Sequence, residues 1–311
     1  MRFDGLDLNL LVALDILIDE RNVSTAADRL CLSQSAMSSA LKRLRDYFED
    51  DLLVTCGRRM VLTARAEDLA APVRNALLQI RSNVTRPQSF EPAVSERKFS
   101  IMLSDYMREV VLAPFLRGLA ATAPKLRFEL WTPGDHPAEA IETGEVDLMI
   151  NIDRYVSPHH PARLLLEDDY VVVADADHPD LVDGIDRDLF LGLDHVSMSF
   201  GRLKEPTWCD RMIEEQAGGM RRIAVSVSSF VAVPDFVIGT RRVATMHRRL
   251  ATLLGATLPL RIHEHPLALP GIREMVQWNS FSHRDPGLRW LIDTLVGFAL
   301  GADVPERLSA E

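Results

Sequence analysis

The sequence predicts an α+β multidomain protein, in which an N-terminal winged helix-turn-helix and a linker helix precede a larger α/β region of two lobes. Residues 6–48 carry helical apolar patterns separated by a short turn, and residues 52–63 have the pattern of a hairpin. Beyond about residue 97 the chain alternates β-type and helical runs in two successive sets. At 311 residues the chain is also too long for one compact core.

A buried scaffold helix and two helices joined by a tight turn are expected at the start. The run Leu6–Ile18 is apolar enough to be buried on more than one side. Ser24 is placed to N-cap a short helix with Ala26 and Ala27 on its apolar face, and Ser33 is placed to N-cap the next helix. The buried stripe of that second helix follows the spacing i, i+3, i+4, i+7, i+11 and comprises Met37, Ala40, Leu41, Leu44 and Phe48.

The opposite face of this second helix is polar and suits contact with DNA. Gln34 and Lys42 can reach base edges in the major groove, while serine hydroxyls and the helix N-terminus suit phosphates. The hairpin that follows has two arginines near its tip, where they can touch the DNA backbone or minor groove. The candidate DNA-binding residues are Ser24, Thr25, Ser33, Gln34, Ser35, Ser38, Ser39, Lys42, Arg43, Arg58 and Arg59. Periodicity alone leaves a small helical interaction domain with a hairpin as an equal alternative.

Net charge gives little support to a nucleic-acid partner. The chain carries a formal charge of -10, whereas DNA-binding proteins usually present a basic face. Residues 1–65 contain nine Lys and Arg against ten Asp and Glu, a net charge of -1, so most of the negative charge lies in the rest of the chain. Pattern rather than charge therefore has to identify the DNA-binding region.

A long helix with an apolar seam is expected at residues 66–90. Its seam repeats at heptad-like spacing and comprises Ala66, Leu69, Ala70, Val73, Leu77, Ile80 and Val84. Such a seam needs a partner helix, and a second copy of the chain is the natural one. Pro72 lies inside the pattern and removes one backbone donor, which predicts a kink or a later start of the helix.

The remaining chain has the pattern of parallel-stranded α/β units, in which ligands bind beyond the carboxyl ends of strands. Polar residues at predicted strand ends can hydrogen-bond a phenolic or carboxylate ligand, and Phe200 or Phe230 offers a ring to pack on. The candidate effector-binding residues are Ser104, Thr132, Asn151, Ser199, Phe200 and Ser228. For each hydroxyl or amide, capping of the following helix is an equal alternative.

Other chemistries find little support in the sequence. His263-Glu264-His265 and the pair His159-His160 lack further ligands at metal-site spacing, so no metal is expected. No nucleophile-elbow, P-loop or dinucleotide-binding motif is present, so we expect neither an enzyme nor a cofactor. No membrane span or signal peptide is recognisable, and the three cysteines show no disulfide or metal spacing. A cytoplasmic protein with free thiols and no membrane partner is expected.

Residues 7–74 are similar to the DNA-binding head of the LysR-type transcriptional regulators. They run from DLNLLVALDILIDERNVSTAADRL through LSQSAMSSALKRLR and the hairpin. The opening MRFDGLDLNLLVALD and the ending VQWNSFSHRDPGLRWLID look like the branch with the NodD nodulation regulators and the aromatic-catabolism regulators. The sequence departs from the family pattern at two positions. Ser35 replaces a usual proline at a helix position near DNA, and Arg65 disturbs the usual Leu-Thr-x-Ala-Gly ending where the hairpin joins the linker helix.

The resemblance implies a regulator with a periplasmic-binding-protein-like effector domain. We expect a DNA-binding domain at 1–65, a dimerisation helix at 66–90 and an effector domain at 91–311, with lobe I at about 97–168 and 266–300 and lobe II at about 169–265. The implied partners are double-stranded promoter DNA, a small aromatic or phenolic effector, RNA polymerase, and further copies in a homodimer or homotetramer. An activator is expected. The alternative is a two-lobed solute-binding module without DNA function.

Overall fold

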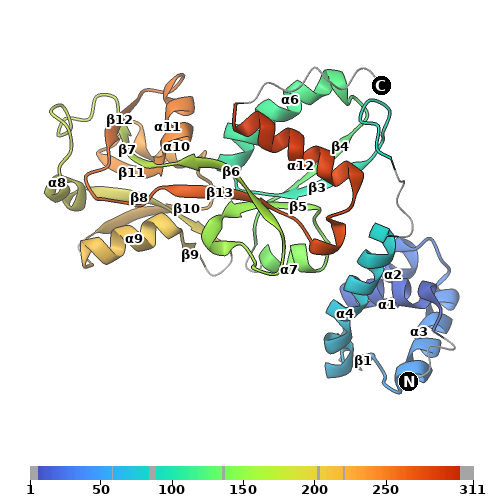
Figure 1. Cartoon of the computed structure of the whole chain (residues 1–311). Coiled ribbons are helices and arrows are strands. Elements are labelled where there is room, and N and C mark those ends of the chain that lie inside the picture. The colour runs from blue at the N-terminus through green and yellow to red at the C-terminus, as the bar shows by residue number, and fades with distance from the viewer. Residues whose placement is uncertain are drawn as a thin grey trace. The chain divides into compact units, whose positions relative to one another are not determined.

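The computed structural model describes residues 6–57, 59–83, 89–134, 137–201, 204–219 and 221–301. The chain forms two compact units, the first ending at Pro87 and the second holding nearly all of the chain from Gln88 onward (Figure 1). Each unit has its own hydrophobic core, which is the main requirement of a domain.

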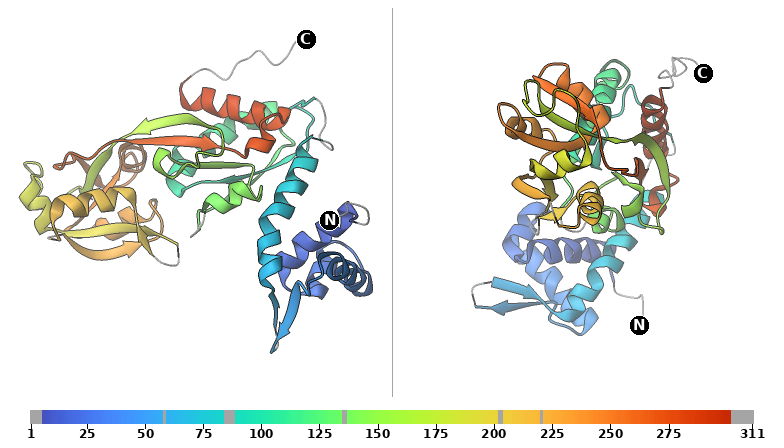
Figure 2. Two further views of the ribbon diagram at one scale, coloured as in Figure 1. Left: turned by 60° about the horizontal axis from the view of Figure 1, so that its bottom comes forward. Right: turned by 90° about the vertical axis from the view of Figure 1, so that its left-hand side faces the viewer.

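The first unit has the element order that the sequence predicts. Its elements are α1 (Leu8–Glu20), α2 (Val23–Arg29), α3 (Gln34–Phe48), β1 (Leu53–Cys56), β2 (Arg59–Leu62) and α4 (Ala64–Asn83). The strands β1 and β2 pair antiparallel, and the hairpin projects from the helical body (Figure 2). The predicted winged helix-turn-helix is thereby confirmed.

The N-caps show why α2 and α3 begin where they do, and one of them corrects the sequence prediction. Asn22, not Ser24, caps α2, because Asn22 Oδ1 accepts hydrogen bonds from the backbone N–H of Ser24 at 2.8 Å and of Thr25 at 3.2 Å. Asparagine caps as well as serine does and comes earlier in the chain, which leaves Ser24 in the first helical turn. Ser33 caps α3 as predicted, its Oγ accepting from the N–H of Ala36 at 3.2 Å.

The core of the first unit follows the predicted stripes. Met37, Leu41 and Leu44 of α3 are buried, and Ala40 and Phe48 pack against them at the edge. On α2, Ala26 and Ala27 are almost fully buried, so their small side chains let α2 and α3 approach closely. The α3 stripe therefore faces the core, and the other side of α3 faces out.

The long helix α4 differs from the sequence prediction in two ways. It begins at Ala64, so Pro72 lies inside the helix and does not delay its start. Ala66, Val73 and Leu77 are buried in the core of this same unit, where α4 packs on α1. The seam therefore has a partner within the chain, and its burial alone does not require a second copy. Val84 lies outside the described residues.

The second unit contains two sheets among the residues that the structure describes. One sheet has the order β4-β3-β5-β13-β6 and the other the order β10-β8-β11-β7-β12, with β9 beside β8. The strands of the first are β3 (Lys98–Met102), β4 (Arg127–Trp131), β5 (Leu148–Ile152), β6 (Ala162–Asp168) and β13 (Ile272–Gln277). Those of the second are β7 (Tyr170–Asp175), β8 (Asp194–Phe200), β9 (Glu205–Pro206), β10 (Arg222–Val227), β11 (Arg242–His247) and β12 (Leu260–Glu264). We call the sheets, with their helices, lobe I and lobe II.

Helices cover both sheets. Lobe I carries α5 (Asp105–Met107), α6 (Ala113–Thr122), α7 (Pro137–Glu142) and α12 (Pro286–Ala299), and lobe II carries α8 (Arg187–Gly192), α9 (Trp208–Ala217), α10 (Val233–Val237) and α11 (Arg248–Gly255). A π-helical turn at Arg108–Leu112 joins α5 to α6. Pro286 opens α12 as predicted, with Asp285 as its N-cap. The two-lobed α/β architecture is confirmed.

Each sheet is mixed, which corrects the prediction of parallel sheets. In lobe I, β3 runs parallel to β4 and β5, whereas β13 runs antiparallel to β5 and β6. In lobe II, β8 runs parallel to β10 and β11, whereas β7 runs antiparallel to β11 and β12. The strand that runs antiparallel to both of its neighbours, β13 in lobe I and β7 in lobe II, is the one that the chain enters from the other lobe. β6 leads into β7 at Asp169, and β12 leads back to β13. Two neighbouring crossovers make a hinge between the lobes.

Candidate functional site

The outer face of α3 presents a row of exposed polar side chains. Gln34, Ser35, Ser38, Ser39 and Lys42 are all exposed, as the spacing predicts, and the adjacent Arg43 is exposed as well. The buried stripe on the other side holds this face in a fixed orientation.

Some side chains of this row form hydrogen bonds within the protein, and others are uncommitted, meaning that they form none with the described residues. Ser39 Oγ donates to the backbone carbonyl of Ser35 at 2.9 Å, and the hydroxyls of Ser33 and Ser35 lie 3.0 Å apart. Among the residues that the structure describes, the side chains of Gln34 and Ser38 have no hydrogen-bond partner. Gln34 and Ser38 are therefore the side chains that can give all their hydrogen bonds to another molecule.

The first turn of α2, the helix that precedes α3, carries two further hydroxyls. Ser24 and Thr25 are exposed, and their backbone N–H groups are held by Asn22. The turn between α2 and α3 is closed by the N–H of Leu32 donating to the carbonyl of Ala27 at 2.9 Å. This short closed turn is the geometry of a helix-turn-helix.

The hairpin is fixed to α3 by contacts that sequence reasoning missed. The Arg45 guanidinium donates to the carbonyls of Asp51 at 2.7 Å and Leu53 at 2.6 Å, so this arginine supports the hairpin. Hydrogen bonds from the Thr63 hydroxyl and the Leu52 N–H, each at 2.6 Å, hold the pKa of Asp50 below its ordinary value. The signal for both roles was their position just before the hairpin, with Arg45 in the last turn of α3 and Asp50 between α3 and β1.

One of the two predicted tip arginines can be placed. Arg59 opens β2 opposite Cys56 and is exposed, and Gly57 takes the positive φ of 64° that the tight turn needs. Arg58 lies outside the described residues.

In lobe I, the predicted effector residues gather at one sheet edge. Ser104 follows β3, Thr132 follows β4, and Asn151 lies near the end of β5, three neighbouring parallel strands. Ser104 is also an N-cap, since its Oγ accepts from the N–H of Met107 at 3.2 Å. Thr132 is exposed, and Asn151 Oδ1 accepts from the N–H of Ile152 at 2.9 Å.

In lobe II, the other three candidates end neighbouring parallel strands. Ser199 and Phe200 end β8, and Ser228 follows β10. The hydroxyl of Ser199 lies 3.0 Å from that of Ser226, and Ser228 is exposed. The Phe200 ring meets the ring of Phe230 edge to face, with centroids 5.8 Å apart.

The two lobes touch through residues next to these candidates. Asp105 of lobe I accepts hydrogen bonds from Ser229 Oγ at 2.6 Å and from the N–H of Val231 at 3.1 Å, both in lobe II. The Tyr106 ring of lobe I stacks on His247 of lobe II at 4.0 Å.

A second contact joins the lobes elsewhere along their junction. The guanidinium of Arg154, which follows β5, lies 3.8 Å from the ring centre of Trp208 at the start of α9.

Buried polar groups surround this junction. Burial lowers the pKa of His247 to about 3, so its ring is neutral, and its Nδ1 has no hydrogen-bond partner among the described residues. The Tyr106 hydroxyl donates to Asp168 at 2.7 Å. Burial, with the nearby charges of Asp168 and Asp153, raises the pKa of Glu274 to about 8. Sequence reasoning missed these residues because only the fold brings their strands together.

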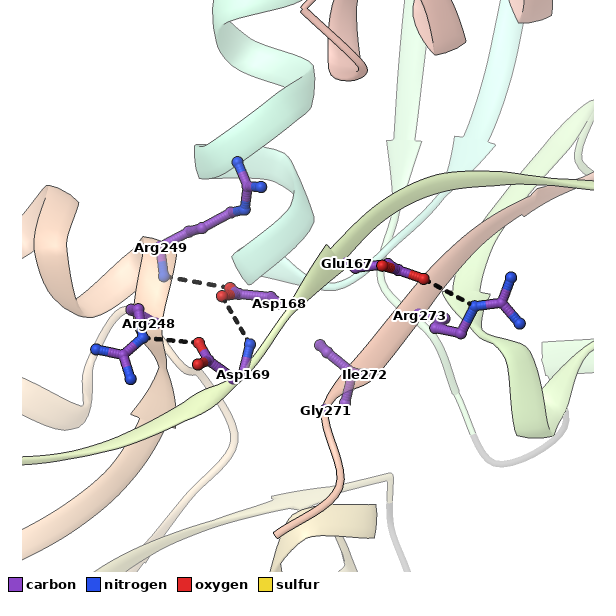
Figure 3. Close-up of a pocket in the computed structure, with 8 residues that line it drawn as sticks. All are labelled: Glu167, Asp168, Asp169, Arg248, Arg249, Gly271, Ile272 and Arg273. Atoms are coloured by element: carbon purple, nitrogen blue, oxygen red, sulfur yellow. Dashed lines mark hydrogen bonds and ion pairs between the residues drawn. The ribbon is translucent and has the colours of Figure 1, made fainter. Parts of the chain in front are cut away.

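A surface pocket of about 630 Å³ lies at the hinge (Figure 3). Its lining is mostly charged and comprises Glu167, Asp168, Asp169, Arg248, Arg249, Gly271, Ile272 and Arg273. Arg248 binds Asp169 and Glu264 at 2.7 Å each, and Arg273 binds Glu167 at 3.2 Å. The Arg249 side chain extends away from Asp168, to which its backbone N–H donates (Figure 3). Because its charges are paired with one another, this pocket is less suited to an aromatic ring than the aromatic junction between the lobes is.

The histidine pairs do not form a recognisable metal centre. His265 Nε2 lies 3.1 Å from Thr245 Oγ1, and His160 Nδ1 accepts weakly from the N–H of Ser280 at 3.4 Å. Within the described ranges, no group of three or more His, Cys, Asp or Glu side chains could hold a metal ion. In the same part of the chain, no helix is both long enough and apolar enough to cross a membrane.

Family models match both units. Residues 8–67 match the bacterial regulatory helix-turn-helix protein model of the lysR family, and residues 93–299 match the LysR substrate binding domain. The chain is 42% identical over 296 residues to nodulation protein D 1 of Mesorhizobium japonicum, covering 95% of this chain and 94% of that protein. It is 39% identical to nodulation protein D 1 of Neorhizobium galegae, with full coverage of both.

Solved structures agree with these matches. A probable transcriptional regulator from Pseudomonas aeruginosa aligns with a TM-score of 0.64 at 31% identity, covering 96% of this chain and 98% of that one. The LysR family regulator CbnR, in complex with its target DNA, shares the fold with a TM-score of 0.60 at 14% identity, covering 94% of this chain and all of that one. The alternative of a solute-binding module without DNA function is therefore wrong, and the chain belongs to the LysR family of bacterial transcriptional regulators.

Proposed function

We propose that residues 1–65 read promoter DNA, residues 66–90 form a dimer, and residues 91–311 sense a small aromatic effector. The observation that carries this proposal is the outer face of α3, where Gln34 and Ser38 are exposed and uncommitted while the stripe behind them is buried. The protein acts by binding and not by catalysis, in the cytoplasm where promoter DNA lies.

The DNA contacts divide by side-chain chemistry. Gln34, Ser38 and Lys42 contact base edges in the major groove, as the uncommitted donors and acceptors of α3. The remaining hydroxyl and cationic side chains contact phosphates, because phosphate contacts position the protein without needing a particular base. The phosphate set comprises Ser24, Thr25, Ser33, Ser35, Ser39, Arg43, Arg58 and Arg59.

A second copy uses the part of the linker helix that the chain's own core leaves open. Ala71 and Pro72 of α4 are exposed, on the side away from the buried Val73 and Leu77. Two dimers then form the homotetramer, with paired heads on a partly palindromic site.

The effector binds between the lobes, where the strand ends of both sheets meet an aromatic cluster. Phe200 and Phe230 supply edge-to-face surfaces for a ring, and Ser104, Thr132, Asn151, Ser199 and Ser228 supply hydrogen bonds around it. The nodulation relatives and the aromatic-regulator resemblance favour a phenolic inducer and an activator that contacts RNA polymerase. Ligand binding shifts the arrangement of the heads and thereby the DNA bend.

A footprint on the DNA beside the protein's own gene tests this proposal. We expect a protected region that changes in extent when flavonoid, salicylate-like or chlorinated aromatic compounds are added. Protection that none of the compounds alters would contradict the aromatic-sensor part, and no protection at low salt would contradict the DNA-binding part.

The Arg59→Ala substitution should weaken binding to all DNA sequences alike. Arg59 is exposed at the start of β2, so its loss removes one phosphate contact and lowers the slope of log K against log salt by about 1. Binding constants at several salt concentrations measure this slope. Arg289→Ala removes the same charge from the exposed side of α12 and should leave the slope unchanged. An unaltered slope in Arg59→Ala excludes a phosphate contact there.

A further inference from the structure

The contact of Asp105 with lobe II has the form of a bound carboxylate. One oxygen of Asp105 accepts from the Ser229 hydroxyl at 2.6 Å and from the N–H of Val231 at 3.1 Å. The Ser229 hydroxyl also accepts from the N–H of Ala232 at 3.2 Å, which directs its proton toward Asp105. Two donors of lobe II thus converge on one carboxylate oxygen of lobe I.

No cation in the described part of the chain shares this carboxylate. Among the described residues, no Lys or Arg nitrogen lies within 4.0 Å of Asp105 as an ion pair. The selectivity for a negative oxygen therefore comes from a hydroxyl and an amide, which are the donors that bind carboxylates in many ligand sites.

A further polar atom and an aromatic wall lie beside this donor pair. His247 is near enough for the Asp105 charge to act on it, and its Nδ1 is buried without a partner in the described part of the chain. Its ring is also packed edge to face against Phe230, with centroids 4.8 Å apart. A molecule bound at the donor pair would find a ring to pack on and one more nitrogen to satisfy.

We propose that Ser229 Oγ–H and Val231 N–H form a carboxylate-binding pair, which Asp105 occupies in this structure and from which an aromatic carboxylic acid displaces it. The acid places its carboxylate on the two donors and its ring against Phe230. This inference deepens the proposed sensor function and rests on it for the meaning of the displacement.

Displacement couples binding to the hinge. The Asp105 hydrogen bonds join lobe I to lobe II, so an acid that takes the donor pair removes two bonds between the lobes. The ligand therefore favours arrangements in which the lobes are less tightly joined.

Chemical rescue of Asp105→Ala in the full chain tests the site directly. The substitution leaves the donor pair unoccupied, so sodium acetate should raise the melting temperature of the variant above that in sodium chloride of equal ionic strength. Wild-type protein should show no such difference, because Asp105 holds the site. Adding Ser229→Ala to the variant should abolish the acetate effect, and adding Thr252→Ala, which removes an exposed hydroxyl of α11, should retain it.

Competition by an aromatic acid provides the second measurement. Benzoate should bind Asp105→Ala at least about tenfold more tightly than wild type by calorimetry, while neutral benzyl alcohol should bind both alike. Should Asp105→Ala fail to fold, Asp105→Asn takes its place, since the neutral amide competes less well for the donors.

Equal effects of acetate and chloride on the folded variant, or an acetate effect that survives Ser229→Ala, overturn the proposal. The acetate measurement needs neither DNA nor inducer. A positive acetate result with a footprint that no aromatic compound alters would therefore reject the sensor function and leave the carboxylate site standing.

Discussion

Replacing Gln34 with alanine is expected to weaken binding to the specific DNA site by about 10- to 100-fold while leaving binding to random DNA unchanged. The side chain is exposed at the start of α3 and has no partner in the described part of the chain, so its amide can pair with an adenine edge. A bidentate base contact is worth about 1–3 kcal/mol of discrimination, which sets this range. Thermal stability should change little, because no described residue forms a hydrogen bond with this side chain.

Ser38→Ala and Ser39→Ala form a matched pair for the same measurement. Both hydroxyls are exposed on one helix, but Ser39 donates to the Ser35 carbonyl whereas Ser38 is uncommitted. Ser38→Ala should therefore reduce specific binding, and Ser39→Ala should affect specific and random DNA alike. Gel-shift titrations with a specific and a random DNA fragment at one salt concentration give the ratio of the two dissociation constants for each variant. Equal losses on both fragments for Gln34→Ala would contradict base reading by α3.

Glu274→Gln is expected to stabilise the protein at alkaline pH by up to about 5 kcal/mol. Glu274 lies buried on β13, and desolvation together with Asp168 and Asp153 raises its pKa to about 8 from an ordinary value of 4.5. Between these values the folded chain holds a proton that the unfolded chain has lost, so stability falls as pH rises, by up to about 1.4 kcal/mol per pH unit. The contribution is complete below pH 4.5 and lost as pH passes through 8.

Urea unfolding of wild type and variant from pH 5 to 9 measures this difference. Glutamine has no proton to lose, so the variant should lack the decline, and its advantage should grow with pH. Glu215→Gln, on the exposed side of α9, should give the same pH dependence as wild type. A constant difference between Glu274→Gln and wild type across this range would show that Glu274 keeps an ordinary pKa.

Local patterns were enough to predict the first unit. The α3 stripe, the Ser33 cap and the hairpin each depend on residues close in sequence, and the structure has all of them. The errors arose where two local choices compete: Asn22 and Ser24 are both good caps, and the chain uses the earlier one. The later helix start, one of the two outcomes that Pro72 predicted, is not found, since packing of α4 on α1 outweighs one lost backbone bond.

The junction between the lobes depends on pairings that no local pattern contains. Asp105 meets Ser229 across 124 residues, and Tyr106 stacks on His247 only because β3 and β11 end at facing edges. Strand ends could be recognised from the sequence, which is why Ser104, Ser199 and Ser228 fall beside the contacts. The residues that actually join the lobes are their neighbours in the chain, such as Asp105 and Ser229.

The ratio of two dissociation constants tests sequence-specific binding by the first unit most directly. The full-length protein is titrated at one fixed salt concentration onto the DNA upstream of its own gene and onto a scrambled fragment of equal length. We predict at least about 10³-fold tighter binding to the upstream DNA, as is typical of specific regulators. Equal affinity for the two fragments would contradict the assignment of base reading to the outer face of α3.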